Sequence, residues 1–147
     1  MNVPVNVHIS EALIKRLEKR NENLHDAVRE AVQSYYALVD ATEVEMRSMF
    51  TDAESALLCE LFKNNDMGIE RFQEWPMLFA WDVEDVERCE KISVNYGVDP
   101  VLLSEKLEVL THSQALWLMD RIRQFKRRED AAALGEEVVQ VDFATMD

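Results

Sequence analysis

The pattern of apolar and polar positions changes once within the first forty residues. Val5, Val7 and Ile9 alternate with polar residues, and strict alternation is typical of a half-buried β-strand. From residue 11 onward, apolar residues recur every three or four positions, which predicts two amphipathic helices separated by the polar run 20–23. The apolar positions of these helices are Leu13, Ile14 and Leu17, then Leu24, Ala27, Val28, Ala31, Val32 and Tyr35. The segment is therefore expected to fold as strand, helix, turn and helix.

A lone strand cannot satisfy its own backbone hydrogen bonds. The chain shows no second strand pattern near this one, so the simplest partner is the same strand of a second copy, antiparallel across a two-fold axis. We therefore expect a homodimer in which a two-stranded ribbon lies above four helices. The side chains expected in the dimer core are Val5, Val7, Ile9, Leu17, Val28 and Val32.

Four short stretches carry a family likeness across about the first quarter of the chain. They are the strand Val5-Asn6-Val7-His8-Ile9, the helix start Ser10-Glu11, the run from Leu13 to Leu17, and the run from Ala27 to Val32. Together they resemble the ribbon–helix–helix family of dimeric DNA-binding proteins. The resemblance implies that the outward strand residues Pro4, Asn6 and His8 enter the DNA major groove, where Asn can pair with adenine. It also implies that the start of the second helix, from Asn23 to His25, contacts phosphate.

This likeness has departures and one supporting feature. The outward strand face carries no Lys or Arg, Pro4 cannot donate to a strand ladder, and the turn between the helices has no Gly. The first predicted helix does carry a basic cluster, formed by Lys15, Arg16, Lys19 and Arg20, whose four-residue spacings place it on one helical face. We interpret this cluster either as a phosphate contact beside the ribbon or as a solvated helix face.

The rest of the chain shows helical patterns only, with few Gly or Pro to interrupt them. The predicted helices are Leu24 to Ser48, one opening at the capping box Thr51 to Glu54, Pro76 to Tyr96, Pro100 to Leu110, and one from the capping box Thr111 to Gln114 to about Ala132. Gly97 and Gly135 are expected to end helices, and Asp99 to cap the one that opens with Pro100. The segments FTDAESALLCELF and LTHSQALWLMDRI are similar, through either duplication or chance.

These patterns predict a mostly α-helical protein in three parts. Residues 1–48 form the ribbon–helix–helix unit for dimerisation and DNA binding, and 49–135 form an acidic helical domain. Residues 136–147 form an acidic tail, for which a docked strand and a disordered arm both remain open. The chain has no run of 18 apolar residues and no leader of the secretory type, so we expect a cytoplasmic protein without a membrane span.

Charge is divided unevenly along the chain, whose net charge is −13. Residues 1–40 hold five basic and six acidic side chains, whereas residues 41–147 hold 11 basic and 23 acidic ones. A negative field opposes association with DNA, because phosphate binding draws on Lys and Arg. A second basic patch lies at Arg121, Arg123, Lys126, Arg127 and Arg128, where it either complements a helix C-terminus or contacts a partner.

The sequence contains no catalytic constellation, so we expect neither an enzyme nor a cofactor. The acidic group Asp82, Glu84, Asp85 and Glu87 suits a solvated helix face better than a metal site. Trp75, Trp81 and Trp117 lie among apolar residues and are expected in the core. Cys59 and Cys89 are expected to be reduced and buried.

Two functions fit these observations. The first is a dimeric transcriptional regulator that binds a palindromic DNA site, with the acidic helical domain binding an effector or partner. The alternative is an acidic inhibitor of the phage anti-defence or nucleic-acid-mimic type. Such a protein would bind a basic nucleic-acid-binding protein and would use the ribbon only to dimerise.

Overall fold

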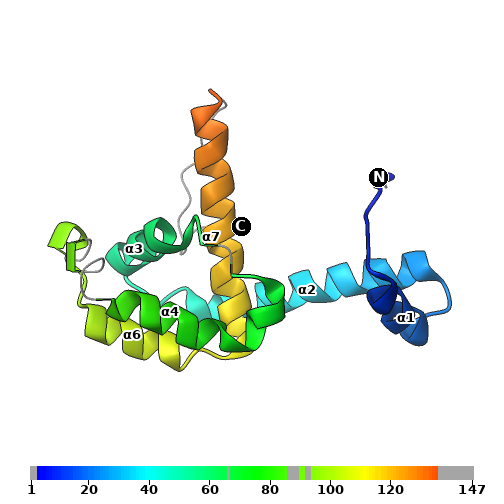
Figure 1. Ribbon diagram of the computed structural model, residues 1–147, viewed down its shortest axis with the longest axis horizontal. Helices are drawn as coiled ribbons and strands as arrows, with labels where there is room; N and C mark the ends of the chain where they lie inside the picture. The colour runs from blue at the N-terminus through cyan, green and yellow to red at the C-terminus, as the bar shows by residue number, and fades with distance from the viewer. Residues whose placement is uncertain (1–2, 66, 86–89, 92–93, 136–147) are drawn as a thin grey trace. The chain divides into compact units, whose positions relative to one another are not determined.

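The computed structural model describes residues 3–65, 67–85, 90–91 and 94–135 (Figure 1). Its elements are α1 (Glu11–Arg20), α2 (Leu24–Met46), α3 (Asp52–Phe62), the 3-10 helix η1 (Ile69–Glu74), α4 (Trp75–Glu84), α6 (Pro100–Glu108) and α7 (His112–Ala133). The described chain divides into unit 1, Met1–Leu38, and unit 2, Val39–Asp147. The sequence placed its first boundary at residue 48, whereas these units meet within α2.

The described part of the chain is helical and contains no β-strand, so the predicted ribbon is wrong. Residues 3–10 precede α1 without pairing to any other described segment, and Val5 and Val7 are 75% and 65% exposed. The alternation in this segment specifies which side chains share a face. It does not supply the neighbouring backbone that a strand needs for its N–H and C=O groups. The mostly α-helical character of the prediction is confirmed.

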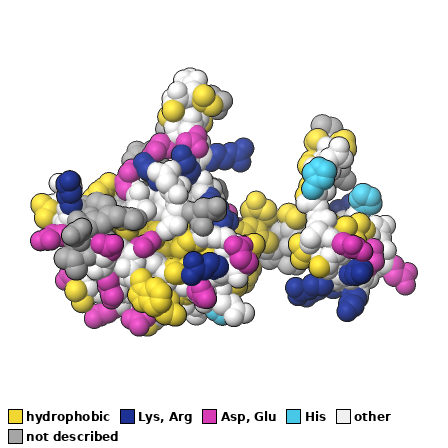
Figure 2. Space-filling model, in the orientation of Figure 1, with side chains coloured by type: hydrophobic (Ala, Val, Ile, Leu, Met, Phe, Trp, Pro, Cys, Tyr) yellow, Lys and Arg dark blue, Asp and Glu magenta, His cyan; other side chains and the backbone are white. Residues whose placement is uncertain are grey.

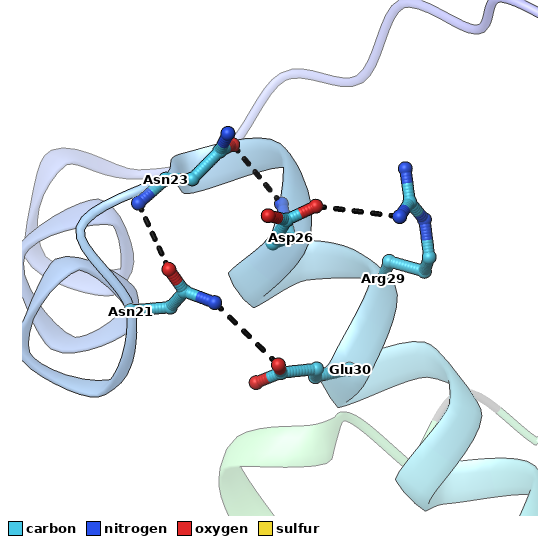
Figure 3. A network of polar contacts seen from close by, with 5 residues as sticks. All are labelled: Asn21, Asn23, Asp26, Arg29 and Glu30. Atoms are coloured by element: carbon cyan, nitrogen blue, oxygen red, sulfur yellow. Dashed lines mark hydrogen bonds and ion pairs between the residues drawn. The ribbon is translucent and has the colours of Figure 1, made fainter.

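Unit 1 is a pair of helices joined by a turn that asparagine side chains stabilise in place of glycine (Figure 3). Asn21 Oδ1 accepts from the Asn23 N–H at 3.0 Å, and Asn23 Oδ1 accepts from the Asp26 N–H at 3.2 Å. Asn21 also donates to Glu30 at 3.5 Å, and Asp26 pairs with Arg29 at 3.3 Å. Short asparagine side chains imitate backbone turns in this way, which explains how a turn without Gly closes.

Unit 2 has a core of large aromatic and aliphatic side chains. The rings of Phe62 and Phe79 meet edge to face at 4.8 Å, which joins α3 to α4. Trp75 is fully buried and its Nε1 donates to the Gly68 carbonyl at 3.2 Å, which holds η1 against α4. Trp117 is also fully buried, on α7, which packs against α3 and α4. Tertiary packing therefore determines where these helices lie.

The local signals for helix starts and ends are largely confirmed. Thr51 with Glu54, and Thr111 with Gln114, form complete capping boxes. Asp99 accepts from the N–H groups of Val101 and Leu102, as an N-cap before Pro100 does. Gly97 and Gly135 adopt positive φ angles of 67° and 81°, the left-handed conformation expected at a helix end.

One predicted helix is divided. The sequence predicts a continuous helix from Pro76 to Tyr96, but α4 ends at Glu84, and Asp85 has the extended ψ of 104°. No Gly or Pro marks this break, so helical periodicity alone missed it. The helix start expected at Ser10-Glu11 is confirmed: Ser10 caps α1, and its Oγ accepts from the Leu13 N–H at 3.3 Å.

Candidate functional site

The residues predicted to contact DNA bases lie in the segment before α1. Pro4, Asn6 and His8 are exposed, but no strand fixes which way they point. His25 is exposed at the start of α2. Asn23, predicted to contact phosphate, instead uses its side-chain oxygen to cap α2. Contact of these residues with DNA therefore stays a prediction.

The basic cluster of α1 is exposed, and Figure 2 shows Lys and Arg side chains gathered on part of unit 1. Lys15 pairs with Glu11 at 3.7 Å in a solvent-exposed contact, which is worth little in water. Arg16, Lys19 and Arg20 form no ion pair with another described residue. These three cations are therefore available to an anionic partner.

The side chains predicted for the dimer core are exposed or half-buried in the single chain. Val5, Val7 and Val32 are exposed, while Ile9, Leu17 and Val28 are half-buried. Further apolar side chains are exposed in the same unit, namely Val3, Leu13, Tyr36 and Leu38. Among the described residues of unit 1, only Ala27 is buried. Unit 1 thus presents apolar surface that the single chain does not cover.

The second basic patch, on α7, is largely used inside unit 2. The Arg121 side chain is 4% exposed and its guanidinium donates to Glu43 at 2.6 Å. Arg123 lies 5.8 Å from the ring centre of Trp75, and Lys126 pairs with Asp130 at 2.7 Å. For these residues, contacts within the fold replace the predicted helix-end or partner roles.

Two lysines of unit 2 are also neutralised by carboxylates. Lys63 pairs with Glu129 at 2.8 Å and with Glu60 at 2.9 Å, and these hydrogen bonds raise the pKa of Lys63 to about 12. Lys106 donates to the buried carboxylate of Glu54 at 2.6 Å. These two cations are therefore already paired within unit 2.

Exposed acids lie on α4 and α6, which pack side by side and antiparallel (Figure 1). Ser104 on α6 donates to Glu84 at the end of α4 at 2.6 Å, and this bond fixes the register of the two helices. Figure 2 shows hydrophobic and acidic side chains together over this pair. We call the exposed residues of the pair, together with Asp85 at the end of α4, the α4–α6 face; they are Met77, Trp81, Glu84, Asp85, Val101, Leu102, Glu105 and Glu108. Lys106, already bonded to Glu54, is the single Lys or Arg in the two helices.

The acids of this face do not stabilise their own helices. Glu84 occupies the last turn of α4, and Glu105 and Glu108 occupy the last turn of α6. A carboxylate near a helix C-terminus faces the negative end of the helix dipole, an unfavourable position. The Ser104 hydroxyl compensates Glu84 in part. Helix stability therefore does not explain the charge of the α4–α6 face.

The predicted core position of Trp81 is wrong. It was predicted in the core with Trp75 and Trp117, but it is 58% exposed. The helical periodicity of residues 75–84 would have shown that Trp81 lies on the opposite side of the helix from the buried positions. Phe79 and Val83 are buried, so Trp81, two positions from each, points nearly opposite to them.

The two cysteines were predicted to be reduced and buried. Cys59 is buried as predicted, and burial, with Glu60 nearby, raises its pKa to about 12, so the thiol is protonated at neutral pH. Cys89 and Glu87 lie outside the described residues. Within the described part, no cluster of three His, Cys, Asp or Glu could hold a metal ion.

Every helix among the described residues is too short or too polar to span a membrane. The acidic tail predicted at 136–147 lies outside the part of the chain that the structure describes. The features that bear on function are thus the charged and apolar surfaces of each unit. No family model, no curated protein and no solved structure matches this chain.

Proposed function

We propose that this chain is an acidic protein-binding module that uses the α4–α6 face to occupy a basic surface of another protein. The observation that supports this is the group of exposed acids on the face. Glu84, Asp85, Glu105 and Glu108 are exposed there, and Lys106, the single Lys or Arg within α4 and α6, is bonded to Glu54. A basic surface that binds nucleic acid offers the complementary charge, so the module would act as a competitive inhibitor.

The net charge supports the same function through association kinetics. A chain of net charge −13 attracts a basic partner over about a Debye length, roughly 8 Å at physiological salt. Charges at the rim of an interface mainly set the association rate and its salt dependence. We therefore expect fast association that slows as salt rises.

The test is whether the protein displaces duplex DNA from a lysine polymer. A fluorescent duplex bound to poly-lysine is titrated with the protein at two salt concentrations, and anisotropy reports release of the DNA. In the face variant Asp85→Asn/Glu105→Gln/Glu108→Gln, we expect displacement to need about 10-fold more protein, because three charge contacts weaken.

A control variant with the same net charge makes this test specific. Asp40→Asn/Asp52→Asn/Glu70→Gln also removes three exposed acids, but from α2, α3 and η1. We expect it to displace DNA within about twofold of the parent protein. If the face and control variants lose activity equally, net charge alone is responsible and the face is not the site.

DNA binding is a second candidate function, favoured by one observation. Arg16, Lys19 and Arg20 are exposed on α1 and form no ion pair with a described residue. The same duplex without poly-lysine distinguishes this function. A direct, salt-sensitive rise in anisotropy that Arg16→Gln/Lys19→Gln abolishes would favour DNA contact by α1.

We also infer that unit 1 associates with a second copy of this chain through its apolar side chains. A unit of 38 residues with a single buried residue among those described has too small a core to be stable alone. Residues 1–40 carry six acidic and five basic side chains, so two copies would meet there with little repulsion. A second copy would cover exposed positions such as Val32 and Tyr36 without any strand pairing.

Sedimentation velocity tests this association. The parent protein is expected to sediment at twice the 17.1 kDa mass of the chain. Val32→Glu/Tyr36→Glu places two charges among the apolar side chains and is expected to yield monomer. The control Gln33→Glu/Ser34→Glu adds the same charge at exposed polar positions of α2 and should remain dimeric. A parent protein that sediments as a monomer would contradict the inference.

A further inference from the structure

An exposed tryptophan lies within the acidic α4–α6 face. Trp81 is 58% exposed, and Met77, one helical turn before it, is 46% exposed. The other two tryptophans, Trp75 and Trp117, are fully buried, so Trp81 is the one tryptophan outside the core of unit 2. Tryptophan and methionine on a surface are typical of protein-binding sites.

The register of the two helices places Glu84 and Glu108 near the level of Trp81 along the pair. Glu84, one turn after Trp81, bonds to Ser104, and α6 runs antiparallel to α4. The turn of α6 that follows Ser104 is therefore level with Trp81, and it carries Glu108. An apolar centre with a charged rim is the usual anatomy of a protein interface. A partner complementary to this face is therefore apolar along its middle and basic at its edges.

The backbone of the face limits the shape of that partner. Both elements are helices, and a helix has no free sheet edge to which an extended peptide could add. Met77 and Trp81 form an i, i+4 apolar row along α4, and such a row packs against a similar row on another helix. Lysine side chains on that helix can extend their apolar stems over the face and reach the carboxylates.

We infer that the α4–α6 face binds an amphipathic basic helix, with Trp81 as the apolar anchor and Glu84, Glu105 and Glu108 as the rim. This inference rests on the proposed function and specifies the chemistry of the partner. The apolar residues of the partner helix contact Met77 and Trp81. Its Lys or Arg residues pair with the rim.

The test uses two synthetic peptides of about 18 residues, or five helical turns. The first contains Leu and Lys arranged so that Leu occupies one helical face. The second has the same composition with the Leu residues spread around the helix. Titration calorimetry with the full chain measures both affinities. Circular dichroism shows whether the first peptide becomes helical on binding.

Substitutions at Trp81 separate the anchor from the charge. Trp81→Ala is expected to weaken binding of the amphipathic peptide by about 30-fold, the effect of removing an interface anchor. Trp81→Phe should recover most of the loss, because an aromatic ring remains. Ile69→Ala truncates another exposed apolar side chain, on η1, and should bind as the parent protein does. The thermal unfolding midpoint of each variant should stay near that of the parent protein, since these positions are exposed.

The outcomes distinguish the anchor from the acidic site. If Trp81→Ala binds as the parent protein does while Asp85→Asn/Glu105→Gln/Glu108→Gln binds weakly, the anchor inference is wrong and the proposed function stands. If both variants bind as the parent protein does, both are wrong. Equal affinity for the two peptides would also overturn the inference, because charge without amphipathic order would then suffice.

Discussion

Replacing Trp75 with alanine is expected to lower the free energy of unfolding of unit 2 by about 3–5 kcal/mol. The side chain is fully buried, meets the ring of Phe72 edge to face at 5.2 Å, and donates to the Gly68 carbonyl at 3.2 Å. Alanine would leave a large cavity and would remove one of the two hydrogen bonds to the Gly68 carbonyl, which also accepts from the Arg71 N–H. Urea denaturation followed by circular dichroism measures the loss.

Trp81→Ala is the matched control for this prediction. It removes the same atoms from the same helix, but from an exposed position, and should change stability by no more than about 0.5 kcal/mol. Equal destabilisation by the two substitutions would mean that the assignment of Trp75 to the core and Trp81 to the surface is wrong. The pair therefore tests the orientation of α4 as well as the energetics of the core.

Replacing Glu43 with alanine is expected to destabilise unit 2 by about 3–5 kcal/mol through a different cause. The Arg121 side chain is 4% exposed, donates to Glu43 at 2.6 Å, and lies 5.1 Å from the ring centre of Trp117. Its Nε has no hydrogen-bond acceptor among the described residues, so Glu43 provides most of the compensation for its burial. Removing Glu43 would leave a buried charge without an anion.

A second substitution should reverse most of that loss. Glu43→Ala/Arg121→Met replaces the pair by apolar side chains and is expected to recover at least half of the lost stability, because no buried charge remains. The exposed pair of Arg71 with Glu74, at 3.0 Å, is the comparison, and Glu74→Ala should change stability by less than about 1 kcal/mol. A double variant as unstable as Glu43→Ala would show that shape rather than charge explains the loss.

Local signals in the sequence predicted the local structure of this chain well. The capping boxes at Thr51 and Thr111 and the cap at Asp99 form as expected. Each depends on atoms within three or four residues, so the sequence pattern contains the whole interaction. The helical class of the protein followed from the same kind of signal.

The predictions that were wrong depend on contacts between residues far apart in the sequence. The alternation of Val5 and Val7 indicated a strand, but a strand needs a partner that no local pattern provides. The charge on Arg121 indicated a surface patch, whereas its partner Glu43 lies 78 positions away in the sequence. Burial of Trp75 and exposure of Trp81 likewise depend on which side of α4 meets its neighbours. For the candidate site, the sequence showed the excess of acidic residues. It did not show that some of these residues share the α4–α6 face with an exposed Trp81.

The acids at the ends of α4 and α6 bear on how this protein would respond to engineering. A design protocol that optimises stability would place Lys or Arg in the last turn of α6, at Glu105 and Glu108, and would gain about 0.3–1 kcal/mol at each position. The same edits would reverse the charge around Trp81. A thermostabilised version of this chain would therefore unfold at a higher temperature but bind its partner more weakly. Stability would then be a misleading criterion for selecting active variants.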